Sequence, residues 1–117
     1  MVIADRDLSI SSNAWIRFTG AGVLNQVKGN VTATNGSGFI LTATTVGKNL
    51  SVIGATGDII VSYVQVGNNG IFTGNEGAIQ LWYNTFGLNL NGSDNAQAPT
   101  GSNNTAKHKN GQFSNLN

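Results

Sequence analysis

Short runs in which apolar and polar residues alternate, each bounded by a glycine-rich turn, constrain the fold more than any other feature of this sequence. In residues 23–34, VLNQVKGNVTAT, the apolar residues Val27, Val31 and Ala33 are separated by polar ones. Side chains of a strand point alternately to its two faces, so this pattern predicts a strand with one solvated face. No segment keeps an apolar stripe at helical spacing over about ten residues. The sequence therefore predicts an all-β protein.

The segment NGSG at residues 35–38 predicts a tight hairpin, because Asn and Gly readily adopt the positive φ values that such turns require. Residues 23–34 and 39–46 would be its two antiparallel strands. Turns and apolar runs of the same kind predict further strands at residues 8–10, 14–19, 50–53, 59–66 and 78–86. About seven or eight short strands with glycine turns are typical of an antiparallel β-sandwich, a jelly roll or a small barrel. We predict a β-sandwich or jelly-roll domain over residues 1–90.

The strand predicted at residues 59–66, IIVSYVQV, is apolar at most of its positions. Strands that are covered on both faces have such nearly continuous apolar runs. We interpret this strand as packing on the core of the sandwich with one face and on a neighbouring subunit with the other.

The alternating pattern stops after Leu90, and residues 91–117 are rich in Asn and contain the only Pro. We predict an extended C-terminal arm. Ordering each of its residues costs about 1 kcal/mol or more of backbone entropy, whereas burying each of its two large apolar side chains returns only about 2–3 kcal/mol. An ordered arm therefore needs a second surface, most simply a neighbouring subunit, with its Asn side chains satisfying backbone groups. The residues expected at this interface are Lys107, His108, Lys109, Phe113 and Leu116.

The composition is poor in charge: 9% of the residues are charged and the net charge is +1, against about 25% charged residues in an average domain. A net charge this small produces only a weak electrostatic field, which argues against nucleic acid as a partner. The low charge also means little repulsion between copies, which favours self-association or docking on a lattice. The chain has no Cys, and its N-terminus lacks the pattern of a signal peptide. We expect a protein without disulfides or membrane spans that is made in the cytoplasm without a signal peptide.

A metal site is a weaker hypothesis. Asp5 and Asp7 place two carboxylates on one side of an extended segment, but a Ca²⁺ or Mg²⁺ site needs about six oxygen ligands and only three other carboxylates exist. We interpret this segment as a charged lead-in that discourages edge pairing, and we expect no metal or cofactor.

Two similar glycine quartets, GNNG at residues 67–70 and GNEG at 74–77, could cradle a phosphate or bind Ca²⁺ between the coils of a parallel β-helix. They occur only twice, and no Lys or helix follows them. Hairpin turns are therefore the preferred interpretation.

Aromatic residues offer a candidate binding surface. An exposed ring with an amide beside it suits a carbohydrate, and the residues that could form such a platform are Trp15, Trp82, Tyr83 and Asn84. Packing in the core or in an interface is nevertheless the preferred interpretation of these rings, and the sugar site is the alternative. Catalysis is not expected, because His108 is the only histidine and no spacing pairs two carboxylates.

The stretch GVLNQVKGNVTATNGSGFILTATTVG at residues 22–47, together with the Asn-rich C-terminal segment, resembles small bacteriophage virion proteins of the decoration, cement or tail-accessory kind. The resemblance implies a non-enzymatic structural subunit that forms homo-oligomers and docks on a capsid or tail, with the virion as its location. Two alternatives remain open. One is a carbohydrate- or receptor-binding module, and the other is a subunit of a surface filament.

Overall fold

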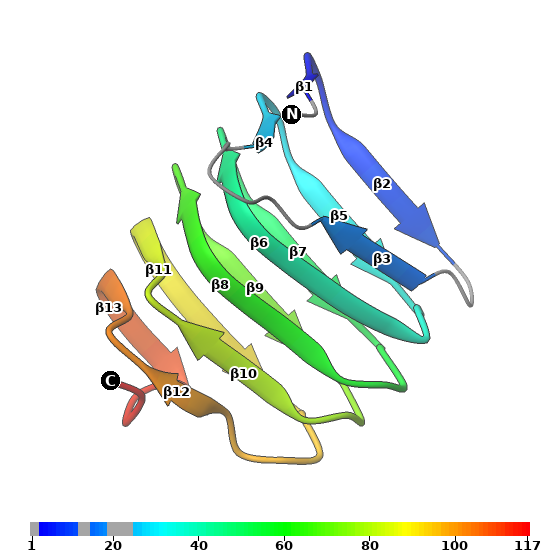
Figure 1. Cartoon of the computed structure of the whole chain (residues 1–117). Helices are drawn as coiled ribbons and strands as arrows, with labels where there is room; N and C mark the ends of the chain where they lie inside the picture. Colours follow the sequence, from blue (N-terminus) through cyan, green and yellow to red (C-terminus); the bar gives the residue numbers. More distant parts are fainter. Residues whose placement is uncertain (1–2, 12–14, 19–24) are drawn as a thin grey trace.

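The computed structural model shows a parallel β-solenoid of about five coils, in which each coil is one circuit of the chain around a common axis (Figure 1). The structure describes residues 3–11, 15–18 and 25–117. In Figure 1 the coils follow one another in sequence order, from the N-terminus at one end of the stack to the C-terminus at the other.

Each coil contributes to three parallel sheets, and several strands bend around a corner and so belong to two of them. Sheet one contains β1 (Ile3–Ala4), β4 (Asn25–Val27), the ends of β6 (Gly38–Val46) and β8 (Ile59–Val66), and the beginnings of β11 (Thr85–Ser93) and β13 (Thr105–Gly111). Sheet two contains β2 (Leu8–Ser11), β5 (Val31–Thr34), β7 (Leu50–Ile53), β9 (Gly70–Thr73) and the ends of β11 and β13. Sheet three contains β3 (Trp15–Phe18), the beginnings of β6 and β8, β10 (Ile79–Trp82) and β12 (Thr100–Ser102).

The coils repeat with a step close to 20 residues. Phe39 pairs with Ile59, and Ile59 pairs with Ile79. The step is 23 residues between the first and second coils, where Leu8 pairs with Val31, and 19 residues between the second and third coils, where Asn25 pairs with Thr44. Because pairing is parallel and in register, equivalent side chains of successive coils lie directly above one another along the axis.

The core lies inside the coils and is built from columns of equivalent apolar residues. One column on sheet two contains Val31, Leu50, Gly70 and Leu90. A Cβ atom on Gly70 would lie 2.5 Å from Cε1 of Phe86, so the ring of Phe86 occupies the space that a larger residue would need. The ring of Phe113 occupies the corresponding space at Gly92. Large and small residues of neighbouring sheets therefore fit together across the axis.

Asparagine side chains line up at each corner and hydrogen-bond from one coil to the next. At the first corner, between sheets one and two, the ladder is Asp7, Asn30, Asn49, Asn69 and Asn89. At the second corner, between sheets two and three, it is Asn75, Asn95 and Gln112. At the third corner, between sheets three and one, it is Asn84 and Asn104. These amides satisfy buried backbone groups, and no buried side-chain N or O atom of the described residues lacks a partner.

The chain ends in a short turn that covers the last coil. Residues 112–117, the C-terminal cap, place Phe113 fully inside and leave Leu116 only 9% exposed. Gln112 accepts hydrogen bonds from Asn95, and the backbone carbonyl of Asn117 accepts them from Asn104. The cap therefore ends both the apolar core and two of the asparagine ladders.

The predicted antiparallel sandwich or jelly roll with an extended C-terminal arm is wrong. The segment predicted as a hairpin turn, residues 35–38, is the second corner of a coil, and the strands on either side of it belong to different sheets. β5 pairs with β2 and β7, whereas β6 pairs with β3, β4 and β8. Residues 91–117 form most of the last coil and the cap instead of an arm that extends from the molecule.

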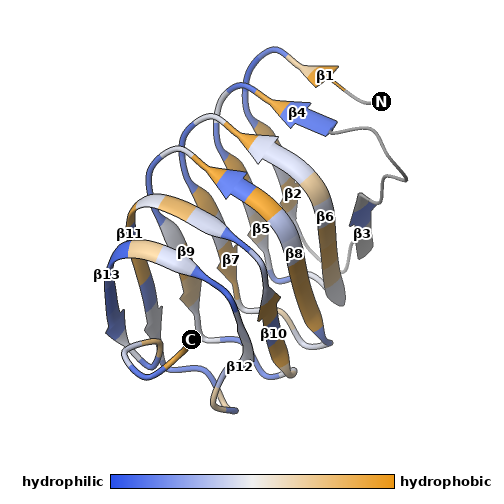
Figure 2. Ribbon diagram, turned by 60° about the vertical axis from the view of Figure 1, so that its left-hand side comes forward, coloured by the Kyte–Doolittle hydropathy of each residue, from blue (hydrophilic) through white to orange (hydrophobic). Residues whose placement is uncertain are grey.

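The interpretation of residues 59–66 as a strand that packs on the core of a sandwich is wrong, whereas contact of its outer face with a neighbouring subunit stays a prediction. The strand bends at Tyr63, which has a φ of 53°. Before the bend, Ile59 and Val61 point inward, and after it Val64 and Val66 do. The bend shifts the inward–outward alternation by one residue. Two short segments that each have one apolar face therefore look in the sequence like a single strand that is apolar on both faces. Figure 2 shows apolar and polar bands following one another along β8.

Candidate functional site

The third corner carries the most unusual surface of the described residues. One column of this corner, called here the corner column, consists of the half-buried Ala43 and the exposed residues Tyr63, Tyr83 and Asn103, one from each of four successive coils. All four have positive φ values, between 49° and 60°. Positive φ is uncommon for residues other than Gly, and it is strained for a bulky side chain.

Tyr63 and Tyr83 stack on each other across two coils. Their ring centroids are 5.0 Å apart and the ring planes differ by 2°. Tyr63 is 61% exposed and Tyr83 is 51% exposed. Ala43 has only a methyl group at the next position of the column, so among the described residues the column places no third ring against Tyr63.

Trp82 adds a third exposed ring to this corner. It lies directly before Tyr83 in the chain, at the end of β10, and is 37% exposed. Its neighbours in sheet three are Ser62 and Ser102, whose side chains are much smaller. The three rings, called here the aromatic corner, therefore stand above a surface of small polar residues.

Of the residues predicted as a carbohydrate platform, the structure brings Trp82 and Tyr83 together on the surface. It does not bring Asn84 there. Asn84 is buried, accepts a hydrogen bond from the backbone N–H of Val64 and donates one to the carbonyl of Val61. Trp15 begins β3 and pairs with Gly38 in sheet three, and its side chain lies outside the described residues.

The predicted interface residues of the C-terminal segment lie around the last coil. Lys107 and His108 are exposed on β13, while Nζ of Lys109 donates a hydrogen bond to the carbonyl of Leu116 at 2.9 Å. Phe113 and Leu116 are buried within their own chain. The structure describes a single chain, so a role of these five residues in contacting a neighbour stays a prediction.

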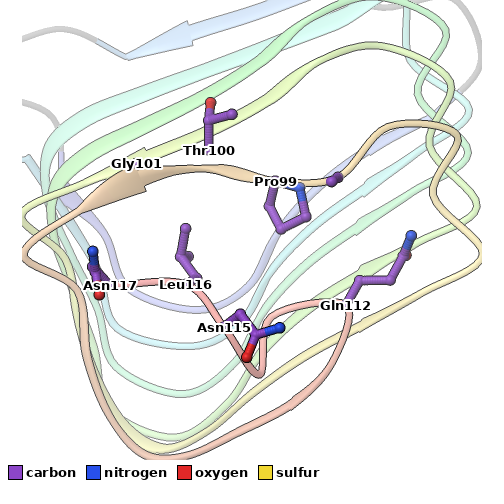
Figure 3. A pocket seen from close by; sticks show the side chains of 8 residues that line it. Pro99, Thr100, Gly101, Gln112, Asn115, Leu116 and Asn117 are labelled. Carbon is purple, nitrogen blue, oxygen red and sulfur yellow. The ribbon is translucent and has the colours of Figure 1, made fainter.

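A cleft of about 410 Å³ lies between this cap and the last strand of sheet three. Figure 3 shows Pro99, Thr100 and Gly101 on one side of it and the cap residues Leu116 and Asn117 on the other. In this coil Pro99 and Gly101 stand where the previous coil has Ile79 and Leu81. The apolar column of sheet three ends here, which leaves the cleft open.

The N-terminal charged segment has a structural role. Oδ1 of Asp7 accepts hydrogen bonds from the backbone and the side-chain amide of Asn30, so Asp7 begins the ladder of the first corner. Asp5 lies 3.2 Å from Nζ of Lys28 in an exposed ion pair. Among the described residues, no three His, Cys, Asp or Glu side chains are grouped as a metal site would require. The described part of the chain also contains no helix long and apolar enough to cross a membrane.

No protein-family model, curated protein or solved structure matches the chain.

Sequence reasoning missed Tyr63 as part of the surface. The signal that could have found it is the 20-residue spacing between Tyr63 and Tyr83, which equals the spacing between Asn69 and Asn89. Residues that recur at one period occupy equivalent places in successive coils of a solenoid.

Proposed function

We propose that this chain is a non-enzymatic carbohydrate-binding module in which the aromatic corner is the contact surface. The observation that carries the proposal is the exposed, stacked pair of Tyr63 and Tyr83 at positions with positive φ. Tyr rings combine an apolar face, which packs on the C–H face of a sugar ring, with a hydroxyl that hydrogen-bonds at the same time.

The stability of the fold does not explain these tyrosines. A left-handed conformation costs a residue other than Gly about 1–2 kcal/mol, whereas one aromatic pair returns about 0.5–1.5 kcal/mol. At the second corner the positions with positive φ are Asn35, Gly54, Gly74 and Asp94, which are residue types that adopt this conformation more readily than Tyr does. Strained residues that a fold does not require are found mainly at binding sites.

The proposal is tested with Tyr63→Asn and Tyr83→Asn. Asn103 already occupies the same column with a φ of 60°, so Asn fits these positions without new strain. We expect the wild-type protein to bind at least one member of a panel of soluble neutral oligosaccharides in calorimetric titrations. Each variant should weaken binding about tenfold or more, which corresponds to 1.4 kcal/mol. Each variant should stay folded and lose no more stability than the about 0.5–1.5 kcal/mol that one aromatic pair contributes.

Absence of binding by the wild-type protein to the whole panel contradicts the proposal. Equal binding by the wild type and the double variant Tyr63→Asn/Tyr83→Asn also contradicts it, because sugar binding would then not depend on the aromatic corner.

A structural subunit of a phage particle is the second proposal, and the unpaired edge of the first coil favours it. β1, β2 and β3 each pair with one strand only among the described residues. A strand edge with free backbone groups can pair with another chain, whether a second copy or a subunit of a capsid or tail. Light scattering over a range of concentrations tests self-association. A monomer at every concentration that also fails to bind phage particles contradicts this role.

A further inference from the structure

We propose that the binding surface extends from the aromatic corner onto the outer face of sheet one, where a linear, neutral polysaccharide lies parallel to the solenoid axis. This inference rests on the proposed carbohydrate binding. It adds the class of ligand, its direction across the coils and the residues that contact it.

A shallow groove of about 450 Å³ runs along this face across three coils. One side is a row of outward polar residues, Thr45, Gln65 and Thr85, in equivalent positions of successive coils. The other side is a row of glycines, Gly47, Gly67 and Gly87. A side chain cannot be added there, because a Cβ on Gly67 would overlap the carbonyl oxygen of Gly47 and one on Gly87 would overlap that of Gly67.

The polar row borders the aromatic corner. Gln65 follows Tyr63 by two residues and Thr85 follows Tyr83 by two residues, so the Cα atoms of each pair lie about 7 Å apart along the strand. The rings and the polar row therefore run side by side along the axis, with the same spacing from coil to coil.

The polar groups of this row are available to a ligand. The side chains of Thr45, Gln65 and Thr85 make no hydrogen bond to any other residue in the part of the chain that the structure describes. Sheet two differs, because there Thr73 lies 3.4 Å from Ser93 and Asn110 donates to Asn91 at 2.8 Å. Among the described residues, these outward polar groups in the last coils of sheet two are thus paired with each other, whereas the side chains of Thr45, Gln65 and Thr85 on sheet one are not.

The chemistry of the groove selects a neutral sugar chain. None of its lining side chains is ionisable, so it offers no counter-charge to an acidic polysaccharide. Hydroxyl and amide groups both donate and accept hydrogen bonds, as sugar hydroxyls require. Successive coils are about 4.8 Å apart, a distance close to the length of one pyranose unit in an extended chain. We therefore expect one sugar per coil.

The test is a series of linear neutral oligosaccharides of increasing length, titrated into the wild type and into Gln65→Ala and Thr85→Ala. Affinity should rise with each added sugar up to about three, the number of coils that the groove crosses, and then stay level. Each alanine variant should weaken binding of the longer chains about threefold to tenfold and affect a disaccharide less. Thr32→Ala, which changes an outward threonine of sheet two, serves as the matched control and should bind as the wild type does.

The outcomes separate this inference from the proposed function. Binding that depends on Tyr63 and Tyr83 but not on chain length or Gln65 overturns the groove and leaves the aromatic corner as the binding site. Preference for an acidic over a neutral chain overturns the assigned ligand class. Absence of binding to every chain, in the wild type as well, overturns both.

Discussion

The side chain of Asn75 both accepts and donates hydrogen bonds in its corner ladder. At the second corner, Oδ1 of Asn75 accepts a hydrogen bond from the backbone N–H of Ala55, while its amide group donates to the carbonyl of Val52 and to Oδ1 of Asn95. An aspartate could not donate these bonds, and a hydrophobic residue could neither donate nor accept them. The abundance of Asn in the sequence thus has a structural cause at these positions.

We predict that Asn75→Ala destabilises the protein by about 1–3 kcal/mol, because it leaves a buried N–H and a buried carbonyl without partners. Urea unfolding followed by circular dichroism measures the change. Asn68→Ala is the matched control, since Asn68 is half-buried and its side chain makes no hydrogen bond that would be lost within the described residues. Equal losses in the two variants would show that the ladder contributes nothing of its own.

The pairing of Gly70 with Phe86 leads to a second prediction. Gly70→Ala should cost about 1–3 kcal/mol, because the new methyl group would overlap the ring of Phe86. In the double variant Gly70→Ala/Phe86→Leu, the smaller side chain makes room for that methyl group. The double variant should therefore lose less stability than the sum of the two single variants, by at least about 0.5 kcal/mol. Strict additivity in a double-mutant cycle would contradict this packing.

At the scale of the elements, the strands themselves could be predicted from alternation, but the way they connect could not. Asn35 has a φ of 56°, as the hairpin prediction expected of an Asn-Gly turn, yet the chain passes there from sheet two to sheet three. Positive φ bends the backbone sharply in a hairpin and in a solenoid corner alike. Only the partner of each strand distinguishes them, and a single strand segment does not reveal its partner.

For the C-terminal segment, residues 91–117, the sequence indicated that another surface must support it but not which surface. Its need for another surface followed from its poor apolar content, and Asn side chains that satisfy backbone groups were expected: Asn95 donates to the carbonyl of Phe72 and Asn104 to that of Leu81. The surface that receives Phe113 is, however, the end of the chain's own core. Sequence alone could not show that the preceding coils leave a space of that shape.

We predict that the cap is required for the last coil to fold. Phe113→Ala should destabilise the protein by about 3–5 kcal/mol, because it opens a cavity against Phe72, whose ring centroid lies 5.4 Å from that of Phe113. Asn115→Ala, an exposed change within the same cap, should have an effect below about 0.5 kcal/mol. Thermal unfolding by calorimetry distinguishes the two, and a Phe113→Ala protein as stable as the wild type contradicts the role of the cap.

For the whole molecule, the period of about 20 residues is the property that sequence reasoning overlooked. Asn49, Asn69 and Asn89 recur at this spacing, and the three lie in one ladder. Alternation repeats every two residues in parallel and antiparallel sheets alike, so it could not reveal the topology. The sequence alone was enough to name Trp82 and Tyr83 as candidate surface residues. Tyr63 could be placed beside Tyr83 only by recognising the period of 20 residues.

The period makes a prediction about the length of the stack. Duplicating residues 64–83 adds one complete coil in register, and the enthalpy of unfolding should rise by about 14 kcal/mol at about 0.7 kcal/mol per residue. Duplicating residues 64–73 alone adds half a coil, which moves the corners and sheets of the following coils out of register with those before them, and should lower the melting temperature. Scanning calorimetry measures both. A half-coil insertion that is tolerated as well as the full coil would contradict a fold built from equivalent coils.

The corner ladders also make the fold sensitive to hydrolysis of asparagine side-chain amides. Asp7 stands at the start of the first ladder, a position where the side chain has only to accept hydrogen bonds. Asn49, farther along, must donate to Asn30 as well as accept from Asn69. Hydrolysis of that one amide to a carboxylate would replace a donor with a negative charge facing another acceptor. The fold therefore depends on a few side-chain amides whose conversion to carboxylates would break the ladder from within.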